Sequence, residues 1–154
     1  MMISYYYPAP FGQLIVSFTS EKEVYSIDLL DEAKPDLPLL QGEWSEKFNA
    51  YFSGSLKNFN CPPSANGTAF QKRVWQAIAE IPCGKTETYG EIAKKLNSAA
   101  RAVGQACGKN PLPIVIPCHR VVAANGGLGG FNLGGGQQGL EIKQWLLNHE
   151  RAAQ

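Results

Sequence analysis

The chain has 154 residues, of which 44% are apolar and 18% are charged. This balance excludes an intrinsically disordered chain, and the length fits one compact domain or a small domain joined to a larger one. No run of about 18 uncharged apolar residues occurs, so no membrane span is expected. Residues 1–10 lack the basic cluster and the apolar run of a secretory signal.

Charge is divided unevenly along the chain. Residues 1–50 hold three lysines and eight acidic side chains, a net charge of −5, whereas residues 51–154 hold eleven basic and five acidic side chains, a net charge of +6. The C-terminal part is therefore suited to face a polyanion, although imbalance of this kind is also common in ordinary proteins.

Four cysteines are present, at positions 61, 83, 107 and 118, and no two of them form a Cys-x-x-Cys pair. Only two histidines accompany them, so a zinc site is not expected. Without a secretory signal a disulfide framework is not expected either. Most of these thiols should be small buried apolar groups.

The first third of the chain predicts three strands and a short helix. Residues 3–8, 13–18 and 24–30 are candidate strands, two of them separated by the turn residues Phe11-Gly12. Residues 31–42 are acidic and hold two prolines, so we interpret them as a loop. Ser45 is placed to cap a helix over about residues 46–52, which Gly54 ends.

A polar, proline-rich segment that ends in glycine occupies residues 60–67, close to the point where the charge changes sign. We interpret this segment as a linker. It predicts an N-terminal domain over residues 1–62 and a C-terminal domain over residues 67–154.

Helix signals become sharper beyond the linker. Two capping boxes each begin a helix: Thr68 with Gln71 for a helix over about residues 69–80, and Thr88 with Glu91 for a helix that ends at about Leu96. The first of these helices carries an apolar stripe made of Phe70, Val74, Ala77, Ile78 and Ile81.

A third helix is predicted over about residues 99–107, capped by Ser98 and ended by Gly108. Together with the preceding helix it makes a helix-turn-helix candidate, with Arg101 and Gln105 on one face and a net charge of +4 over residues 85–120. A purely structural helix pair has the same spacing, so both interpretations stay open on this evidence.

Residues 110–117 predict a short, buried, extended run that leads to Cys118. A nucleophilic cysteine reacts as the thiolate and needs a base or a positive charge nearby. His119 is the candidate base, and Glu150 offers a carboxylate that could orient its imidazole. The alternative is an inert thiol in the core.

The heptad Ile116-Pro117-Cys118-His119-Arg120-Val121-Val122 resembles the active-site signature of the O6-alkylguanine-DNA alkyltransferases, or methylated-DNA–protein-cysteine methyltransferases. Other pieces resemble the same family in the same order: Phe70-Gln71, Val74-Trp75, Ile81-Pro82, Gly84, Thr86, Thr88-Tyr89, Ala100 to Gly104, Asn110-Pro111, Lys143, Trp145 to Leu147 and His149-Glu150. The resemblance covers about residues 67–154 and is weak over residues 1–60.

This resemblance implies a mixed α/β (α+β) fold, with a small N-terminal domain of sheet and helix before a mainly helical C-terminal domain with a helix-turn-helix. It implies an enzyme that repairs DNA by moving the alkyl group of O6-alkylguanine, and less well of O4-alkylthymine, to Cys118. Each chain would act once, because water cannot easily displace the resulting thioether.

The resemblance also implies catalytic roles. Glu150 orients His119, which takes the proton of Cys118, and Asn110 positions the thiolate. Tyr89 helps to rotate the nucleotide out of the duplex and donates a proton to guanine. A further residue, Arg120, is expected to anchor the structure through a salt bridge.

Contacts with double-stranded DNA are implied for the third helix, which enters the minor groove so that Arg101 occupies the space of the flipped nucleotide. Ala99 and Ala100 let the backbone approach closely, and Gln105 and Tyr89 complete the expected DNA-binding set. The expected pocket for the base consists of Cys107, Val121, Leu128, Gly129, Gly130, Phe131 and Asn132.

Residues 126–139 hold eight of the sixteen glycines, and residues 132–138 are surplus to the family pattern. A flexible connector and a wider pocket wall are both compatible with this composition, and we favour the wall.

We expect no cofactor and no metal, because no nucleotide-binding glycine pattern follows a predicted strand and residues 1–60 hold no histidine or cysteine for the zinc site of some relatives. A monomer in the cytoplasm is expected, associated with the nucleoid, or in the nucleus of a eukaryote. Two alternatives remain: a lesion-binding helix-turn-helix protein without catalysis, and a thiol hydrolase that uses Cys118, His119 and Glu150.

Overall fold

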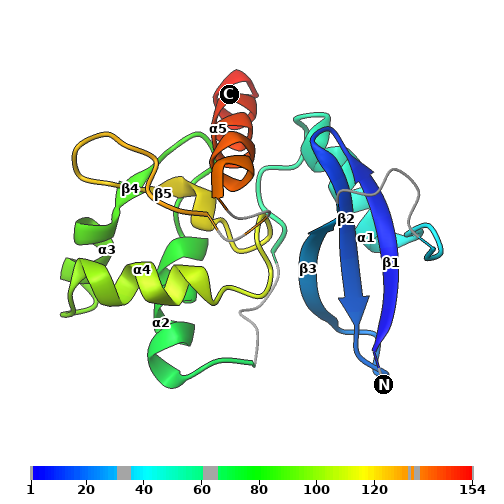
Figure 1. Ribbon diagram of the computed structural model, residues 1–154, viewed down its shortest axis with the longest axis horizontal. Helices are drawn as coiled ribbons and strands as arrows, with labels where there is room; N and C mark the ends of the chain where they lie inside the picture. The colour runs from blue at the N-terminus through cyan, green and yellow to red at the C-terminus, as the bar shows by residue number, and fades with distance from the viewer. Residues whose placement is uncertain (1, 31–35, 61–65, 132, 134–135, 154) are drawn as a thin grey trace.

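The computed structural model describes residues 2–30, 36–60, 66–131, 133 and 136–153. The N-terminal part is a three-stranded antiparallel sheet in the order β1-β2-β3 with one helix packed against it (Figure 1). The strands are β1 (Ile3–Ala9), β2 (Gly12–Phe18) and β3 (Val24–Leu30), and the helix is α1 (Glu43–Phe52). The three predicted strands are confirmed.

Successive side chains of a strand point to opposite faces of this sheet, and one of the two faces is buried. Leu14 and Val16 of β2 are fully buried, and Ile27 of β3 pairs with Val16. Aromatic rings of α1 cover that face, with the Tyr7 ring 5.2 Å from Phe48 and 5.9 Å from a further α1 ring, that of Phe52. Aromatic packing therefore supplies much of the core in this part.

Helix α1 begins three residues earlier than predicted. Its N-cap is Gly42, which has a φ of +85°, and Ser45 lies inside the first turn without capping. Glycine accepts this left-handed backbone, and Glu43 and Glu46 place negative charge where the helix dipole favours it. The glycine turn and the acidic first turn therefore fix the start of α1, in place of the predicted cap by Ser45.

The C-terminal part is mainly helical, with α2 (Ala69–Ala79), α3 (Tyr89–Lys95), α4 (Ala100–Gly108) and α5 (Gly136–Ala152). Two very short strands, β4 (Glu87–Thr88) and β5 (Val121–Val122), pair in parallel, and a single 3-10 turn, η1 (Cys118–Arg120), precedes β5. Both predicted capping boxes are confirmed, at Thr68 and at Thr88.

The start of α4 differs from its prediction. Ala99 is the N-cap and no side chain caps the helix, so Ser98 does not have the predicted role. The turn is instead formed by Asn97, which has a φ of +54°, a left-handed conformation that asparagine tolerates. At the other end Gly108 is the last helical residue, with Lys109 as the C-cap.

Residues 110–117 are buried as predicted but they are not an extended strand. Ile114 has a φ of +76°, and the only ladder contact in this segment is an isolated bridge between Pro113 and Ile116. The side chain of Asn110 explains the compact turn, because it accepts from the Leu112 amide at 2.9 Å and donates to the Ile116 carbonyl at 2.9 Å.

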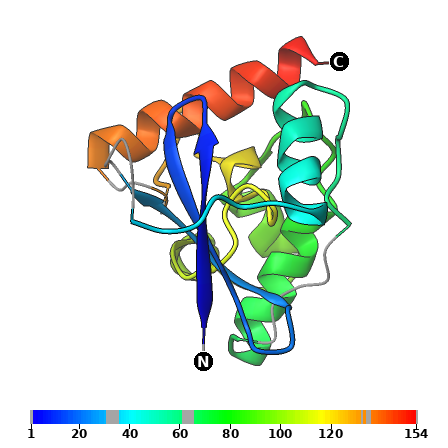
Figure 2. The same ribbon diagram turned by 90° about the vertical axis from the view of Figure 1, so that its right-hand side faces the viewer.

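The two parts share one continuous core, and α5 crosses both of them (Figure 2). The Ile27 amide of the sheet donates to the Pro111 carbonyl at 2.9 Å. Trp145 of α5 packs edge-on against Phe11, with ring centres 5.5 Å apart. The predicted mixed α/β class is confirmed. None of the helices in the described residues has the length and apolar character that crossing a bilayer requires.

Candidate active site

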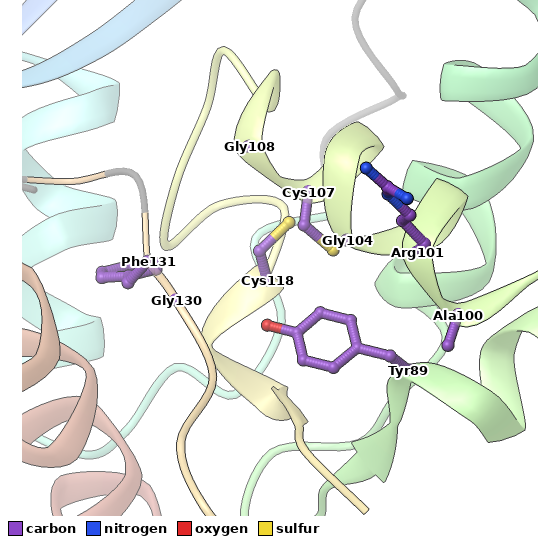
Figure 3. A pocket seen from close by; sticks show the side chains of 9 residues that line it. All are labelled: Tyr89, Ala100, Arg101, Gly104, Cys107, Gly108, Cys118, Gly130 and Phe131. Carbon is purple, nitrogen blue, oxygen red and sulfur yellow. The ribbon is translucent and has the colours of Figure 1, made fainter.

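A cavity of about 480 Å³ opens between α3, α4, η1 and the loop that leads to α5 (Figure 3). Its wall is formed by Tyr89, Ala100, Arg101, Gly104, Cys107, Gly108, Cys118, Gly130 and Phe131. The sequence analysis gave a site role to all of these except Gly104 and Gly108 of α4. Chain segments far apart in sequence therefore bring the predicted nucleophile and the predicted DNA-binding helix to one hollow.

Cys118 lies at the inner end of this cavity and is 3% exposed. Its Sγ accepts a hydrogen bond from Asn110 Nδ2 at 3.1 Å, which is the positioning contact predicted for Asn110. A hydrogen bond with the Cys107 thiol, together with burial, raises the pKa of Cys118 well above its ordinary value. The resting nucleophile is therefore a thiol, and a base must take its proton during reaction.

His119 is fully buried, and its Nε2 lies 2.6 Å from Glu150 Oε2. Burial lowers the pKa of His119, so the ring is neutral near pH 7. Among the described residues its Nδ1 has no hydrogen-bond partner. With Nε2–H held by the carboxylate, Nδ1 is left as the acceptor, which is the form a general base needs.

Glu150 is the centre of the buried polar network. Its carboxylate accepts from Arg120 Nε at 2.8 Å and from the Tyr51 hydroxyl at 2.6 Å, in addition to its contact with His119. Although burial raises the pKa of Glu150, hydrogen bonds from His119 and Arg120 outweigh it and hold the pKa far below its usual value. The salt bridge predicted for Arg120 is present.

Lys143 is a site residue for which the sequence analysis gave no role. It is fully buried on α5, and its Nζ donates to the carbonyls of Val121 at 2.7 Å and Gly130 at 2.9 Å and to the Tyr89 hydroxyl at 3.5 Å. Burial lowers the pKa of Lys143 to about 8. A signal was available, because Lys143 is seven residues before Glu150 and so shares the buried face of one helix.

Tyr89 begins α3, and its hydroxyl points into the cavity near Cys118 (Figure 3). Burial raises the pKa of Tyr89 to about 12, so the hydroxyl keeps its proton and can donate it. Gly129 lies against this ring, and a Cβ at that position would be 2.7 Å from the hydroxyl oxygen. A glycine is required there for the loop to pass so close to Tyr89.

Some predicted pocket residues take other places. Val121 is fully buried in β5 and holds Lys143 through its carbonyl, while Leu128 and Gly129 lie outside the cavity wall. The loop turns past Tyr89 before it reaches the cavity, so only its later residues face the opening. Asn132 lies outside the described residues.

Gly130 and Phe131 are the loop residues that do form part of the wall, as predicted. The Phe131 ring packs edge-on against His119, with centres 6.4 Å apart. An apolar ring over the imidazole keeps that side of the base away from solvent, which supports the interpretation of the glycine-rich segment as a wall.

The predicted DNA-binding residues of α4 lie on the outside of the molecule. Arg101 is exposed at the mouth of the cavity with Ala100, and Ala99 and Gln105 are exposed but do not line it. The DNA contacts assigned to these side chains stay predictions. Among the described residues, no cluster of three histidine, cysteine or acidic side chains is placed to hold a metal ion.

Comparison with known proteins gives a consistent picture. The family described as "6-O-methylguanine DNA methyltransferase, DNA binding domain" matches residues 69–152. The methylated-DNA–protein-cysteine methyltransferase of Methanosarcina mazei is 46% identical over 136 residues, which cover 80% of this chain and 81% of that protein.

Solved structures agree over the whole chain. The crystal structure of the O6-methylguanine methyltransferase of Mycobacterium tuberculosis superposes with a TM-score of 0.82 and 34% identity, covering 100% of this chain and 95% of that one. A structure titled as the same bacterium's enzyme in complex with DNA gives a TM-score of 0.78 and 36% identity, with 97% and 94% covered. With this family match over residues 69–152, these identities and this shared fold, the chain belongs to the O6-methylguanine-DNA methyltransferase family.

Proposed function

We propose that the protein repairs DNA by moving an alkyl group from the O6 atom of guanine to Cys118. The observation that carries this proposal is the position of the Cys118 sulfur, at the inner end of a cavity whose mouth is formed by the exposed start of α4. Such a cavity suits a base that has left the duplex, because the damaged atom is otherwise inside the base stack.

The first chemical step is proton removal from Cys118. His119 Nδ1 is the acceptor, reached through one bridging water, and Glu150 stabilises the imidazolium that forms. The Lys143 ammonium adds positive charge close to the sulfur and favours the thiolate.

The second step is an in-line displacement at the alkyl carbon. The sulfur–carbon bond forms while the bond from that carbon to O6 breaks, and the electron pair of the broken bond goes to the guanine. A proton from Tyr89 neutralises the departing base, and solvent returns the proton to Tyr89. The product is a stable thioether, so each chain is consumed after one reaction.

DNA contact comes from α3 and α4, with α4 in the minor groove. The Arg101 guanidinium takes the space left by the flipped nucleotide, while Ala99 and Ala100 allow close approach of the helix and Gln105 faces the groove. The small side chains and the exposed position of Arg101 support this placement. The partner is double-stranded DNA that carries an alkylated guanine, and O4-alkylthymine is a weaker substrate.

The remaining features follow from this reaction. The protein works as a monomer where the DNA is, in the cytoplasm at the nucleoid or in a nucleus. The part over residues 67–154 carries the reacting and DNA-binding residues, and the part over residues 1–62 stabilises it. A lesion-binding protein without catalysis is disfavoured, because the nucleophile is present and positioned.

A turnover assay tests the proposal against the thiol hydrolase alternative. A duplex with radiolabelled O6-methylguanine is given in tenfold excess over protein, and label on protein is counted with time. We expect transfer to stop at one equivalent per chain and to be absent in Cys118→Ser, while that variant still binds the duplex in an anisotropy titration. Continued turnover, or label on the variant, would overturn the mechanism.

A further inference from the structure

The cavity holds two thiols, and the alkyl-transfer reaction uses only one of them. Cys107 is on α4 and Cys118 is on η1, and the side chains of both line the same wall. In Figure 3 the Cys107 and Cys118 side chains are drawn next to each other, with their sulfur atoms close together. Each thiol shifts the pKa of the other, as expected for two side chains that line one small cavity within reach of each other.

The surroundings favour ionisation of one member of the pair. The hydrogen bond from Cys118 lowers the pKa of Cys107, and the ammonium of Lys143 acts in the same direction. The Asn110 amide donates to the Cys118 sulfur. The pKa of Cys107 therefore lies below its ordinary value, which increases the fraction of that thiol present as thiolate.

Small oxidants can reach the pair. The cavity of about 480 Å³ extends to the surface, where Ala100 and Arg101 are exposed. Hydrogen peroxide is close to water in size, so it enters a space of this volume without any rearrangement of the wall. Cys83, the third cysteine among the described residues, does not line the cavity.

We propose that Cys107 and Cys118 form a redox pair, in which peroxide converts the two thiols to a reversible disulfide. One thiolate attacks peroxide, the oxygen–oxygen bond breaks, and a sulfenic acid and hydroxide form, the latter taking a proton to leave as water. The second thiol then attacks the sulfenic sulfur, the sulfur–oxygen bond breaks, and a second water leaves. In total two thiols lose two electrons and two protons, and one peroxide becomes two waters.

The disulfide has two consequences for the protein. It occupies the sulfur that receives the alkyl group, so repair stops until a thiol reductant restores the pair. It also withholds Cys118 from further oxidation to sulfinic acid, which thiols do not reverse. Cys107 is thus a modification site that preserves a nucleophile each chain can use only once. Only the activity readout of this inference rests on the proposed function.

The test compares wild type, Cys107→Ser and Cys83→Ser after exposure to hydrogen peroxide. Intact mass and peptide mapping without reduction are the primary readout. We expect wild type and Cys83→Ser to become lighter by two hydrogen atoms, with one cross-linked peptide that contains Cys107 and Cys118. In Cys107→Ser, at a peroxide dose that carries an unprotected thiol past the sulfenic acid, we expect two added oxygen atoms at Cys118, a sulfinic acid, and no cross-link.

The second readout is alkyl transfer before and after treatment with dithiothreitol, with each variant compared with its own unoxidised sample. Wild type and Cys83→Ser should recover their transfer, and Cys107→Ser should not. If Cys107→Ser does not fold, Cys107→Ala and the wild-type map still decide the question. No cross-link in wild type, a cross-link through Cys83 or Cys61, or equal recovery in Cys107→Ser would overturn the proposal. Failure of the proposed function would remove the transfer readout but leave the map unchanged.

Discussion

The interiors of the two parts of the molecule differ in the kinds of side chain that they bury. Among the described residues between 3 and 59 the buried residues are apolar or aromatic, and the rings of Tyr7, Phe48 and Phe59 pack against one another. The buried polar residues of the described chain all lie in residues 69–153: Asn110, His119, Arg120, Lys143 and Glu150. The N-terminal part therefore has an apolar interior, whereas the C-terminal part adds to its own apolar core a buried polar network beside Cys118.

This difference shows how the fold stabilises the buried charged groups that surround the nucleophile. Burying charged groups costs free energy unless each finds partners, and here Glu150 satisfies both His119 and Arg120. The N-terminal part contributes the Tyr51 hydroxyl, which donates to Glu150, and the Lys57 carbonyl, which accepts from Arg120 at 3.5 Å. Mutations should therefore separate into those that damage stability alone and those that damage stability and chemistry together.

The largest effect is expected at the centre of the polar network. Glu150→Gln removes the charge that Arg120 and His119 share, and breaking a buried pair in this way costs about 3 to 5 kcal/mol of unfolding free energy. Alkyl transfer should fall as well, because His119 loses its orienting carboxylate. Glu141→Gln, on the exposed side of the same helix, is the control and should change stability by less than about 0.5 kcal/mol. Equal unfolding curves for the two variants would contradict the role of the network.

A large-to-small substitution in the core of the N-terminal part should lower stability without changing the rate of alkyl transfer. Leu14→Ala removes a fully buried side chain of β2 and should cost about 2 to 5 kcal/mol. The transfer rate of the protein that stays folded, measured at low temperature and corrected for the folded fraction, should equal that of wild type. A change in that rate would show that the sheet acts on the site.

Tyr51→Phe tests the hydrogen bond that the N-terminal part donates to the Glu150 carboxylate. The lost hydrogen bond goes to a charged acceptor, so the expected cost is about 1.5 to 3 kcal/mol. The matched control is Tyr7→Phe, which loses a bond to the neutral Asn49 side chain and should cost about 0.5 to 1.5 kcal/mol. If denaturant unfolding gives the reverse order, the carboxylate is not the stronger acceptor.

Acid should weaken the polar part. Burial lowers the pKa of His119, and hydrogen bonds hold that of Glu150 down in spite of burial, so the unfolded chain binds protons more readily at both sites. Unfolding free energy should therefore fall below a pH of about 6.5, the ordinary value for histidine, and further below about 4.3, that for glutamate. Urea unfolding from pH 8 to pH 4 measures this, and Glu150→Gln should lose the lower part of the slope. A flat profile would contradict these shifts.

Arg101→Ala should have the smallest effect on stability, less than about 0.5 kcal/mol, because the side chain is exposed. Its effect should appear in function, as slower transfer from duplex DNA than from the free base O6-benzylguanine relative to wild type. Lys94→Ala, an exposed charge on α3, is the comparison for a general loss of positive charge. Equal slowing on both substrates would place Arg101 in the chemical step instead of nucleotide flipping.

Local sequence signals predicted the elements well. Strand alternation and the two Thr capping boxes located most boundaries, because these patterns act within a few residues. The starts of α1 and α4 were misjudged where glycine and asparagine with positive φ, at Gly42 and Asn97, form the turn in place of a serine cap. The strained Ile114 has no local signal, since the side chain of Asn110 imposes that turn.

The site was predicted only in part, because its side-chain contacts join segments that are far apart along the chain. Cys118, His119 and Glu150 were identified from motif and chemistry, but their mutual contacts depend on α5 returning to η1. The contact of Cys107 with Cys118 and the partners of Lys143 also arise only from the packing of separate segments. Spacing along the chain contains no information on such approaches.

The central claim is that the alkyl group ends on one particular sulfur. It is tested by peptide mapping of the reduced protein after reaction with an excess of duplex that carries O6-methylguanine. The account predicts one added methyl group per chain, on Cys118, with Cys83 and Cys107 unmodified. A protein of unchanged mass beside repaired DNA, or a methyl group on another residue, would contradict it.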